Sequence, residues 1–333
     1  MAEWLYEAGI GESRAALVER GHILELAIER DDQPGPRAGA ILPSRLVRKA
    51  DASGRGLVTL DGGQSAQLMP VPPSLTEGAA LMVEVVREAL REGAETKPVR
   101  VRAAAPGARL RPGSDLRARI EATGRPLRDA AGRVDLLEEH GWSEAMEQAA
   151  SGIVATPDVL LRIALTPAMT LIDVDGSGSA AELAIAGARA AGEAIRRFGI
   201  AGSIGIDLPT LQGKADRQAA AAALDAVLPQ PFERTGVNGF GFLQLVRRRE
   251  RASAMELVQA DPVLAAALSV LRQAEHAQGA GELRLQAHPA VIDRIAARAD
   301  WIDALARRAA APVALRADGR LAISAGHASR AHP

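Results

Sequence analysis

The stretch MTLIDVDGSGS, residues 169–179, decides the fold of this chain. Its first residues are apolar or β-branched and predict a buried strand that we expect to end at Asp173. A helical pattern over 180–199 and a second apolar strand, SIGIDL over 203–208, follow. A strand–helix–strand unit of this length normally makes its two strands parallel, with a right-handed crossover. We therefore expect Asp173 and Asp207 at the same carboxyl edge of one sheet, where open α/β sheets place their sites.

The rest of the chain divides into segments of different character. Short strand-like runs up to about residue 103 predict N-terminal strands and a small five-stranded β-barrel, with a hairpin over 14–30 that turns at Arg20-Gly21. A basic connecting segment occupies 104–134. Residues 135–258 predict an α/β core with further strands over 159–165 and 240–249 and helices over 135–151 and 215–228. Residues 259–333 predict a small α+β unit with a frayed end, GHASRAHP.

Composition limits the class of protein. The 333 residues carry a formal net charge of −1, which points to no particular charged partner. The absence of cysteine excludes disulfides and cysteine-ligated zinc. The sequence has neither a run of about 18 apolar residues nor an apolar signal core, so we expect a cytoplasmic protein with no membrane partner.

The two strand-end aspartates suggest a metal site. Two carboxylates brought together repel each other unless a cation or a proton lies between them. Hard oxygen ligands in a partly open shell suit Mg²⁺, with Mn²⁺ as a second choice. Such a metal activates water and supports in-line attack on a phosphodiester. The structural alternative is that Asp173 and Asp207 are helix caps or turn acids, because two aspartates alone are not a specific signal.

Clustered arginines suggest contacts to phosphate. Between 100 and 133 the chain has nine arginines against three acids, which indicates either a phosphate-binding surface or a solvated linker. A second cluster follows the apolar run at 240–246 and is either a charged element end or a set of RNA contacts. Aromatic residues make up only 2% of the chain, although single-strand binders usually stack bases on them. The candidate RNA-binding residues are Arg109, Arg111, Lys214, Arg247, Arg248, Arg249 and Arg251.

A nucleotide-binding alternative rests on residues 176–181. They fit the pattern G-x-G-x-x-A between a strand and a helix, a weak dinucleotide fingerprint. The acids that precede it count against this interpretation, since carboxylates would face the pyrophosphate. Gly213-Lys214 is followed by Ala215, so it does not complete a P-loop motif. The six histidines lie in separate segments and show no metal-ligand spacing.

Several segments together resemble the bacterial ribonuclease E/G family. TLIDVDGSGS (170–179), AAGEAIRRFGIAGSIGIDL (190–208) and VNGFGFLQLVRRRERAS (237–253) carry the most specific part of the resemblance. The start of the chain and ELRLQAHPAVIDRIAARA (282–299) resemble the family's N-terminal region and its small C-terminal unit. The resemblance implies a ribonuclease-H-like α/β core, an N-terminal S1-type RNA-binding barrel and Mg²⁺-dependent endonucleolytic cleavage of single-stranded RNA in RNA processing or decay. It implies metal binding by Asp173 and Asp207, with Asp175 where the family has an asparagine beside them.

The chain also departs from the family pattern. Without cysteine, a homo-oligomer is not joined through the family's cysteine–zinc link, and the segment expected to sense RNA 5′ ends is largely missing. The barrel's expected aromatic stacking positions correspond to Leu57 and Leu68, which predicts weaker RNA affinity. A helix position expected to be asparagine is Gly187, and a second expected acid is Thr210. These departures leave two hypotheses open: a compact metal-dependent endoribonuclease, or a catalytically weakened or inactive RNA-binding relative.

Overall fold

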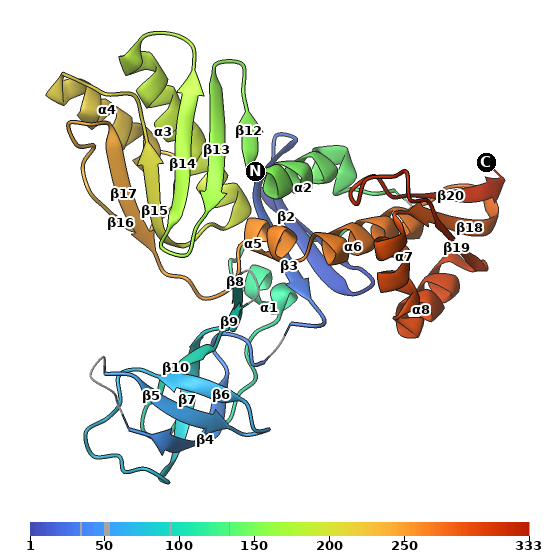
Figure 1. Ribbon diagram of the computed structural model, residues 1–333, viewed down its shortest axis with the longest axis horizontal. Helices are drawn as coiled ribbons and strands as arrows, with labels where there is room; N and C mark the ends of the chain where they lie inside the picture. The colour runs from blue at the N-terminus through green and yellow to red at the C-terminus, as the bar shows by residue number, and fades with distance from the viewer. Residues whose placement is uncertain (34, 50–53, 93–94, 133, 333) are drawn as a thin grey trace.

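The computed structural model describes residues 1–33, 35–49, 54–92, 95–132 and 134–332. They form three lobes around a centre that includes the helices α5 Ala254–Ala260 and α6 Pro262–Glu275 (Figure 1). An α/β lobe, a β-barrel and a C-terminal α+β lobe point in three directions from this centre. The described part of the chain holds eight α-helices and a closed five-stranded barrel. The predicted α/β class is confirmed at this level.

The barrel lies where the sequence predicted it, and its last strand ends at residue 103. Its parallel closing pair joins the third and fifth strands. Leu68 is fully buried in the barrel core, so the expectation that it marks a base-stacking position is wrong. The strands are β4 Ile41–Arg48, β5 Gly56–Leu60, β6 Ser65–Leu68, β7 Ala80–Arg87 and β10 Val99–Ala103, and the short pair β8 Leu90–Glu92 and β9 Glu95–Lys97 leads away from them.

A separate sheet, ordered β11-β1-β2-β3, is built from β1 Glu3–Ala8, β2 Glu12–Glu19, β3 His22–Arg30 and β11 Leu127–Asp129. The predicted hairpin is confirmed, and Arg20 and Gly21 both take the positive φ values that a tight two-residue turn requires. The basic segment is more ordered than a solvated linker, because it contains α1 Leu116–Glu121 and the strand β11, which pairs in parallel with β1. Arg133 of that segment lies outside the described residues.

The α/β lobe holds a six-stranded sheet with α3 and α4 on one face (Figure 1). The strands β14 Thr170–Gly176 and β15 Gly202–Asp207 are parallel, as predicted from the crossover helix between them. Gly141 has a φ of 86° and separates the turn Glu138–His140 from the helix α2 that follows. In spatial order the strands are β12 Ile153–Ala155, β13 Val159–Leu165, β14 Thr170–Gly176, β15 Gly202–Asp207, β17 Phe242–Arg247 and β16 Glu233–Arg234; the helices are α2 Trp142–Ser151, α3 Ala180–Phe198 and α4 Lys214–Asp225.

The C-terminal lobe is a three-stranded sheet packed against helices. The expectation that GHASRAHP frays is wrong, because β20 His327–His332 pairs antiparallel with β18 Ala280–Ala287. The sheet is completed by β19 Val313–Ala317, and the helices are α5 Ala254–Ala260, α6 Pro262–Glu275, α7 Pro289–Ala296 and α8 Ala299–Ala309. In the described chain no single helix is long and apolar enough to cross a bilayer; α5 and α6, bent by 108° at their junction, meet that length and composition only as a pair.

Gly187 allows α3 to approach the sheet closely. A Cβ atom on Gly187 would lie 2.3 Å from Cγ1 of Val174 on β14, so the asparagine expected from the family resemblance does not fit here. We expect Gly187→Asn to lower the free energy of unfolding by about 1–3 kcal/mol, because overpacking displaces the helix. Urea unfolding measures this, with Arg189→Asn on the exposed side of the same helix as the control. Equal stability of both variants would contradict the close approach.

Candidate functional site

One row of side chains crosses the uncovered face of the six-stranded sheet. In the strand register, Arg162 on β13 lies opposite Asp173 on β14, Asp173 lies beside Asp207 on β15, and Asp207 lies opposite Phe242 on β17. Neighbouring strands lie about 4.8 Å apart, and residues paired across them project from the same face. Two carboxylates therefore stand side by side, with a guanidinium on one flank and an aromatic ring on the other.

Asp173 is not at the end of its strand, which corrects the sequence expectation. β14 continues to Gly176, because β13 pairs with it along the whole length of the hairpin. Asp175, two residues further, projects from the same face as Asp173, and Val174 between them is buried beneath the sheet. Asp207 is the last residue of β15, as expected. The register between the parallel strands, rather than a shared sheet edge, brings Asp173 and Asp207 together.

Arg162 is a site residue that the sequence reasoning missed. Its Nη1 lies 3.4 Å from Oδ2 of Asp173, and the same guanidinium also pairs with Asp175. All three side chains are about half exposed, so solvent weakens these ion pairs. The signal was present in VLLRIAL, where one arginine interrupts an apolar strand. Counting back from the Thr166-Pro167 turn places that arginine opposite Asp173.

The chemistry of the row fits a hard divalent cation. Mg²⁺ usually keeps several waters and binds to one or two carboxylates together with substrate phosphate oxygens. Asp173 and Asp207 supply two such carboxylates on an exposed face. Within the described residues, no group of three or more His, Cys, Asp or Glu side chains converges as a metal cluster. The donor set therefore suits a cation that substrate oxygens and water complete, rather than one enclosed by protein.

The arginine run after β17 has mostly intramolecular partners. Arg247 lies opposite Gly202, five residues from Asp207 along β15 and on the other face, and it donates to the carbonyl oxygen of Ile200 at 3.0 Å. Arg249 pairs with Glu256, and Arg251 lies 3.7 Å from a carboxylate oxygen of Glu88, the residue that directly follows β7 of the barrel. The structure thus does not bring Arg247 to the aspartates, and Arg249 and Arg251 hold elements together.

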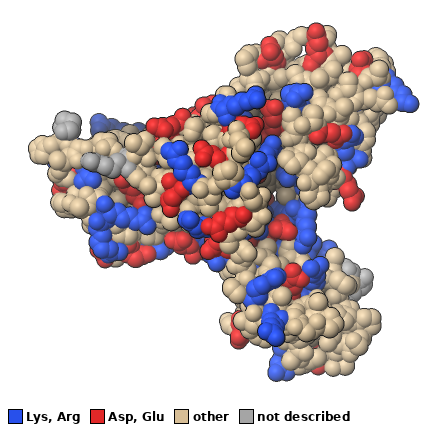
Figure 2. All heavy atoms as spheres, turned by 180° about the vertical axis from the view of Figure 1, so that it is seen from behind, with Lys and Arg blue, Asp and Glu red and all other residues tan. Residues whose placement is uncertain are grey.

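The remaining candidate cations are more accessible but scattered. Arg248 is largely exposed and lies 3.3 Å from Glu250. Arg109 and Lys214 are exposed, and Arg111 donates to the carbonyl oxygen of Gly39 from Nε and Nη2. Figure 2 shows blue and red side chains intermixed over the middle of the opposite face of the molecule. The cations proposed from the sequence therefore do not form one continuous basic groove.

The glycine–serine run after Asp175 is a tight turn and a helix cap. A Cβ on Gly176 would lie 2.2 Å from the carbonyl oxygen of Asp158, and Gly178 has a φ of 100°. Ser179 caps α3, and the Glu182 carboxylate accepts from the Ser179 backbone N–H at 3.0 Å. That carboxylate occupies the helix N-terminus where a dinucleotide pyrophosphate would bind, so the geometry counts against the nucleotide-binding alternative.

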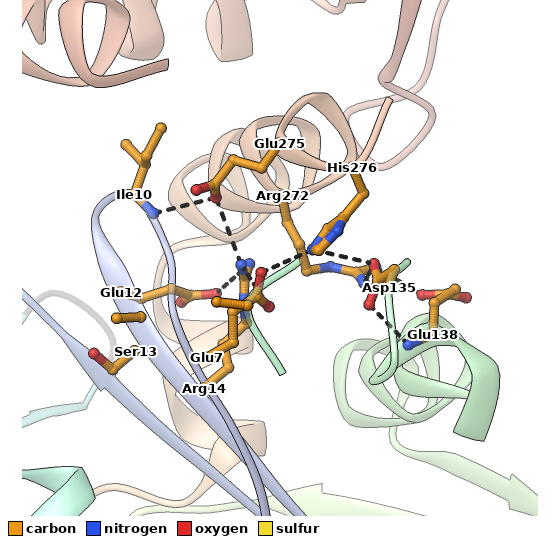
Figure 3. A network of polar contacts seen from close by, with 12 residues as sticks. Glu7, Ile10, Glu12, Ser13, Arg14, Asp135, Glu138, Arg272, Glu275 and His276 are labelled. Atoms are coloured by element: carbon orange, nitrogen blue, oxygen red, sulfur yellow. Dashed lines mark hydrogen bonds and ion pairs between the residues drawn. The ribbon is translucent and has the colours of Figure 1, made fainter. Parts of the chain in front are cut away.

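A buried network of charges joins the N-terminal sheet to α6, and sequence reasoning did not anticipate it (Figure 3). Arg14 on β2 is 1% exposed, and its Nη2 lies 3.1 Å from Oε2 of Glu7 and 3.7 Å from Oε2 of Glu275. Arg272, also buried, reaches Glu138 at 2.7 Å and pairs with Asp135. These residues come from segments far apart in sequence, so no local pattern reveals their contact.

The protonation of this network is set by its contacts. His276 lies 2.8 Å from Glu7, and this hydrogen bond raises the pKa of His276 above its ordinary value although burial opposes it. Burial alone would raise the pKa of Glu7, but the hydrogen bond with His276 and the charge of Arg14 outweigh it and lower that pKa. Burial raises the pKa of Glu12 despite the charges of Arg14 and Arg30. The pKa values of Glu7, Glu12 and His276 are therefore shifted from their ordinary values by the contacts within the network.

No protein-family model matches the sequence, and no curated protein matches it. Function is therefore inferred from the residues and geometry of the site.

Arg162 would compete with any divalent cation that binds to Asp173 and Asp175. We expect Arg162→Gln to bind Mn²⁺ more tightly by roughly fivefold, because two unit charges 4 Å apart in water interact by about 1 kcal/mol. Calorimetric titration with MnCl₂ measures the dissociation constant, with Arg189→Gln on the far side of α3 as the control. Unchanged or weaker Mn²⁺ binding by Arg162→Gln would show that the guanidinium does not oppose a cation at the row.

The raised pKa of His276 predicts a loss of stability in alkali. The protonated imidazolium stabilises the folded state fully below about pH 6.5, the ordinary histidine value, and this contribution is lost as pH rises through the higher folded pKa. We expect the free energy of unfolding to fall over that window in the wild type and to fall less in His276→Gln. Urea unfolding from pH 5.5 to 9 measures both, and His22→Gln, at an exposed position, should keep the wild-type slope.

Proposed function

We propose that this protein is a metal-dependent endoribonuclease that cleaves single-stranded RNA in RNA processing or decay, in the manner of the ribonuclease E/G family that it resembles. The observation that carries the proposal is the direct pairing of Asp173 with Asp207 on an uncovered sheet face. The resemblance assigns metal binding to these same two residues. Mg²⁺ is the proposed cofactor, Mn²⁺ is a substitute, and zinc has no role.

In the proposed activity, each residue of the aspartate row would have a separate role. Asp173 and Asp207 hold the cation, and a cation bound there activates water and stabilises charge on the phosphate oxygens. Arg162 would limit the negative charge of the row and would remain paired with Asp175 when a cation binds to Asp173. Because the row is open to solvent, a single RNA strand can cross the sheet without unfolding any element.

The barrel would contribute to RNA binding through its exposed polar surface. Leu57 is half-buried and Leu68 is buried in the barrel core, so the barrel's contacts would involve phosphate and ribose rather than stacked bases. Arg109, after the barrel, and Lys214 and Arg248, on the α/β lobe, are exposed cations that would contact phosphate. We place the protein in the cytoplasm, acting on RNA and without a membrane partner.

A second candidate function is RNA binding without cleavage. The pairing of Arg162 with Asp173 and Asp175 favours it, because a guanidinium already pairs with two of the three carboxylates and offsets part of their charge. The two candidates differ in one property: only the enzyme requires a divalent cation to act on RNA.

Asp207→Asn tests the proposed activity. This change keeps the shape of the side chain and removes one charged ligand, so we expect Mg²⁺-dependent cleavage of a labelled single-stranded RNA to fall by about a hundredfold or more. Circular dichroism and urea unfolding should match the wild type, because Asp207 is exposed. Glu233→Gln, on the edge strand of the same sheet, is the matched control.

Two outcomes separate the candidates. Cleavage by Asp207→Asn at the wild-type rate would exclude the metal assignment. RNA binding by the wild type with no cleavage at any Mg²⁺ or Mn²⁺ concentration would leave the non-catalytic candidate.

A further inference from the structure

The aromatic residues of this chain are distributed unevenly between core and surface. The chain has only three tryptophans, one tyrosine and four phenylalanines, and the structure describes all eight. Three phenylalanines, at 232, 240 and 242, expose part of their side chains, and Phe232 packs against the core of the α/β lobe. The other five are buried: Trp4, Tyr6, Trp142, Phe198 and Trp301.

Of the remaining two phenylalanines, Phe242 begins β17 at one end of the aspartate row, and Phe240 lies two residues before it. Phe242 lies opposite Asp207 in the strand register, and a Cβ on Gly205 would lie 2.4 Å from Cζ of Phe242 and 3.1 Å from Cδ2 of Leu171. The Phe242 ring and Leu171 thus meet over Gly205 on the uncovered face. Phe240, just before this strand, is 84% exposed.

A rigid turn holds Phe240 in this exposed position. The Asn238 side-chain oxygen accepts from the backbone N–H groups of Phe240 and Phe242 at 2.9 and 3.0 Å. The Leu208 N–H donates to the carbonyl of Gly241, and the Thr210 hydroxyl donates to the carbonyl of Phe240 at 3.4 Å. The turn is therefore fixed to the residues that directly follow Asp207.

The turn is held by backbone contacts that do not require the Phe240 ring. A Cβ on Gly241 would lie 2.1 Å from the carbonyl oxygen of Leu208, so the backbone approaches closely without packing the Phe240 ring. Isolated exposed apolar residues are common and need no explanation, but here the Phe242 ring and Leu171 meet beside Asp207, and the exposed Phe240 precedes Phe242 by two residues. An exposed aromatic ring on a rigid support is the usual device for stacking an unpaired base.

We propose that Phe240 and Phe242 form a base-stacking platform for the nucleotide next to the phosphodiester held at Asp173 and Asp207. This inference rests on the proposed function and deepens it: the ligand is an unpaired nucleobase of single-stranded RNA, recognised by its flat face. Stacking tolerates any base, so the platform positions the strand rather than selecting a sequence. It also gives the α/β sheet the aromatic contact that the barrel lacks.

The experiment uses the full chain and a ten-nucleotide oligoadenylate RNA with one 2-aminopurine, in EDTA so that no cleavage occurs. We expect binding by the wild type with quenched 2-aminopurine fluorescence. Phe240→Ala should bind about five- to a hundredfold more weakly, the usual effect of removing one base–aromatic stack. Phe240→Leu, which keeps the apolar surface, should also lose the quenching, whereas Phe240→Trp should retain it.

Leu110→Ala is the matched control, because Leu110 is an exposed apolar side chain outside the α/β lobe. Equal affinity and quenching in the wild type and Phe240→Ala would overturn the platform, and so would a change of oligomeric state in place of a change in RNA binding. Light scattering on both proteins reports the oligomeric state.

The same samples, returned to Mg²⁺, separate this inference from the proposed function. Phe240-dependent binding without any cleavage would support the platform and refute the nuclease. Cleavage by the wild type with unchanged binding and cleavage in Phe240→Ala would refute the platform and support the nuclease. A wild-type protein that binds no single-stranded RNA either in EDTA or in Mg²⁺ would refute both.

Discussion

The burial of Arg14 is the constraint on which the arrangement of the lobes depends. A guanidinium with 1% exposure cannot be solvated, so it needs carboxylates from elsewhere, here Glu7 and Glu12 on its own sheet and Glu275 on α6. Removing one partner of such a pair typically costs about 3–5 kcal/mol, because the remaining charge stays buried. Arg14 and Glu275 are more than 250 residues apart in sequence, yet neither the N-terminal hairpin nor α6 can keep its charges buried without the other.

This junction also gives the candidate site a rigid base. One continuous core runs from Leu5 and Val18 of the N-terminal sheet to the strands of the α/β lobe, and Arg196 at the end of α3 reaches back to Glu25 at 2.9 Å. The barrel is attached differently, through polar contacts around Glu88, which accepts from the backbone of Ala38. The aspartate row is therefore held by a packed core, whereas the barrel extends from the junction through hydrogen bonds and ion pairs.

Local patterns predicted most elements, and the crossover rule predicted the parallel strands that bring Asp173 and Asp207 together. What failed depended on distant partners. β20 reads as a polar tail and becomes a strand only because β18 offers an edge, and β11 is three residues long and pairs with β1. Predicting that Arg162 lies opposite Asp173 would have required the register of the hairpin. Predicting which face of the sheet Arg247 takes would have required the exact length of its strand. The buried charge network had no local signal at all.

The distribution of arginines changes how RNA binding should be understood in this chain. A sequence rich in arginine suggests a basic groove, but the run after β17 holds the α/β sheet to α5 and to the base of the barrel. Intramolecular carboxylates and carbonyl oxygens already compensate much of that positive charge, so it adds little to the attraction of phosphate. Under the proposed function, affinity would come from what stands on the uncovered face: a cation between Asp173 and Asp207, the flanking Arg162, and exposed rings. The metal and the stacked base would then orient the strand together, and the protein's overall charge of −1 would be no obstacle.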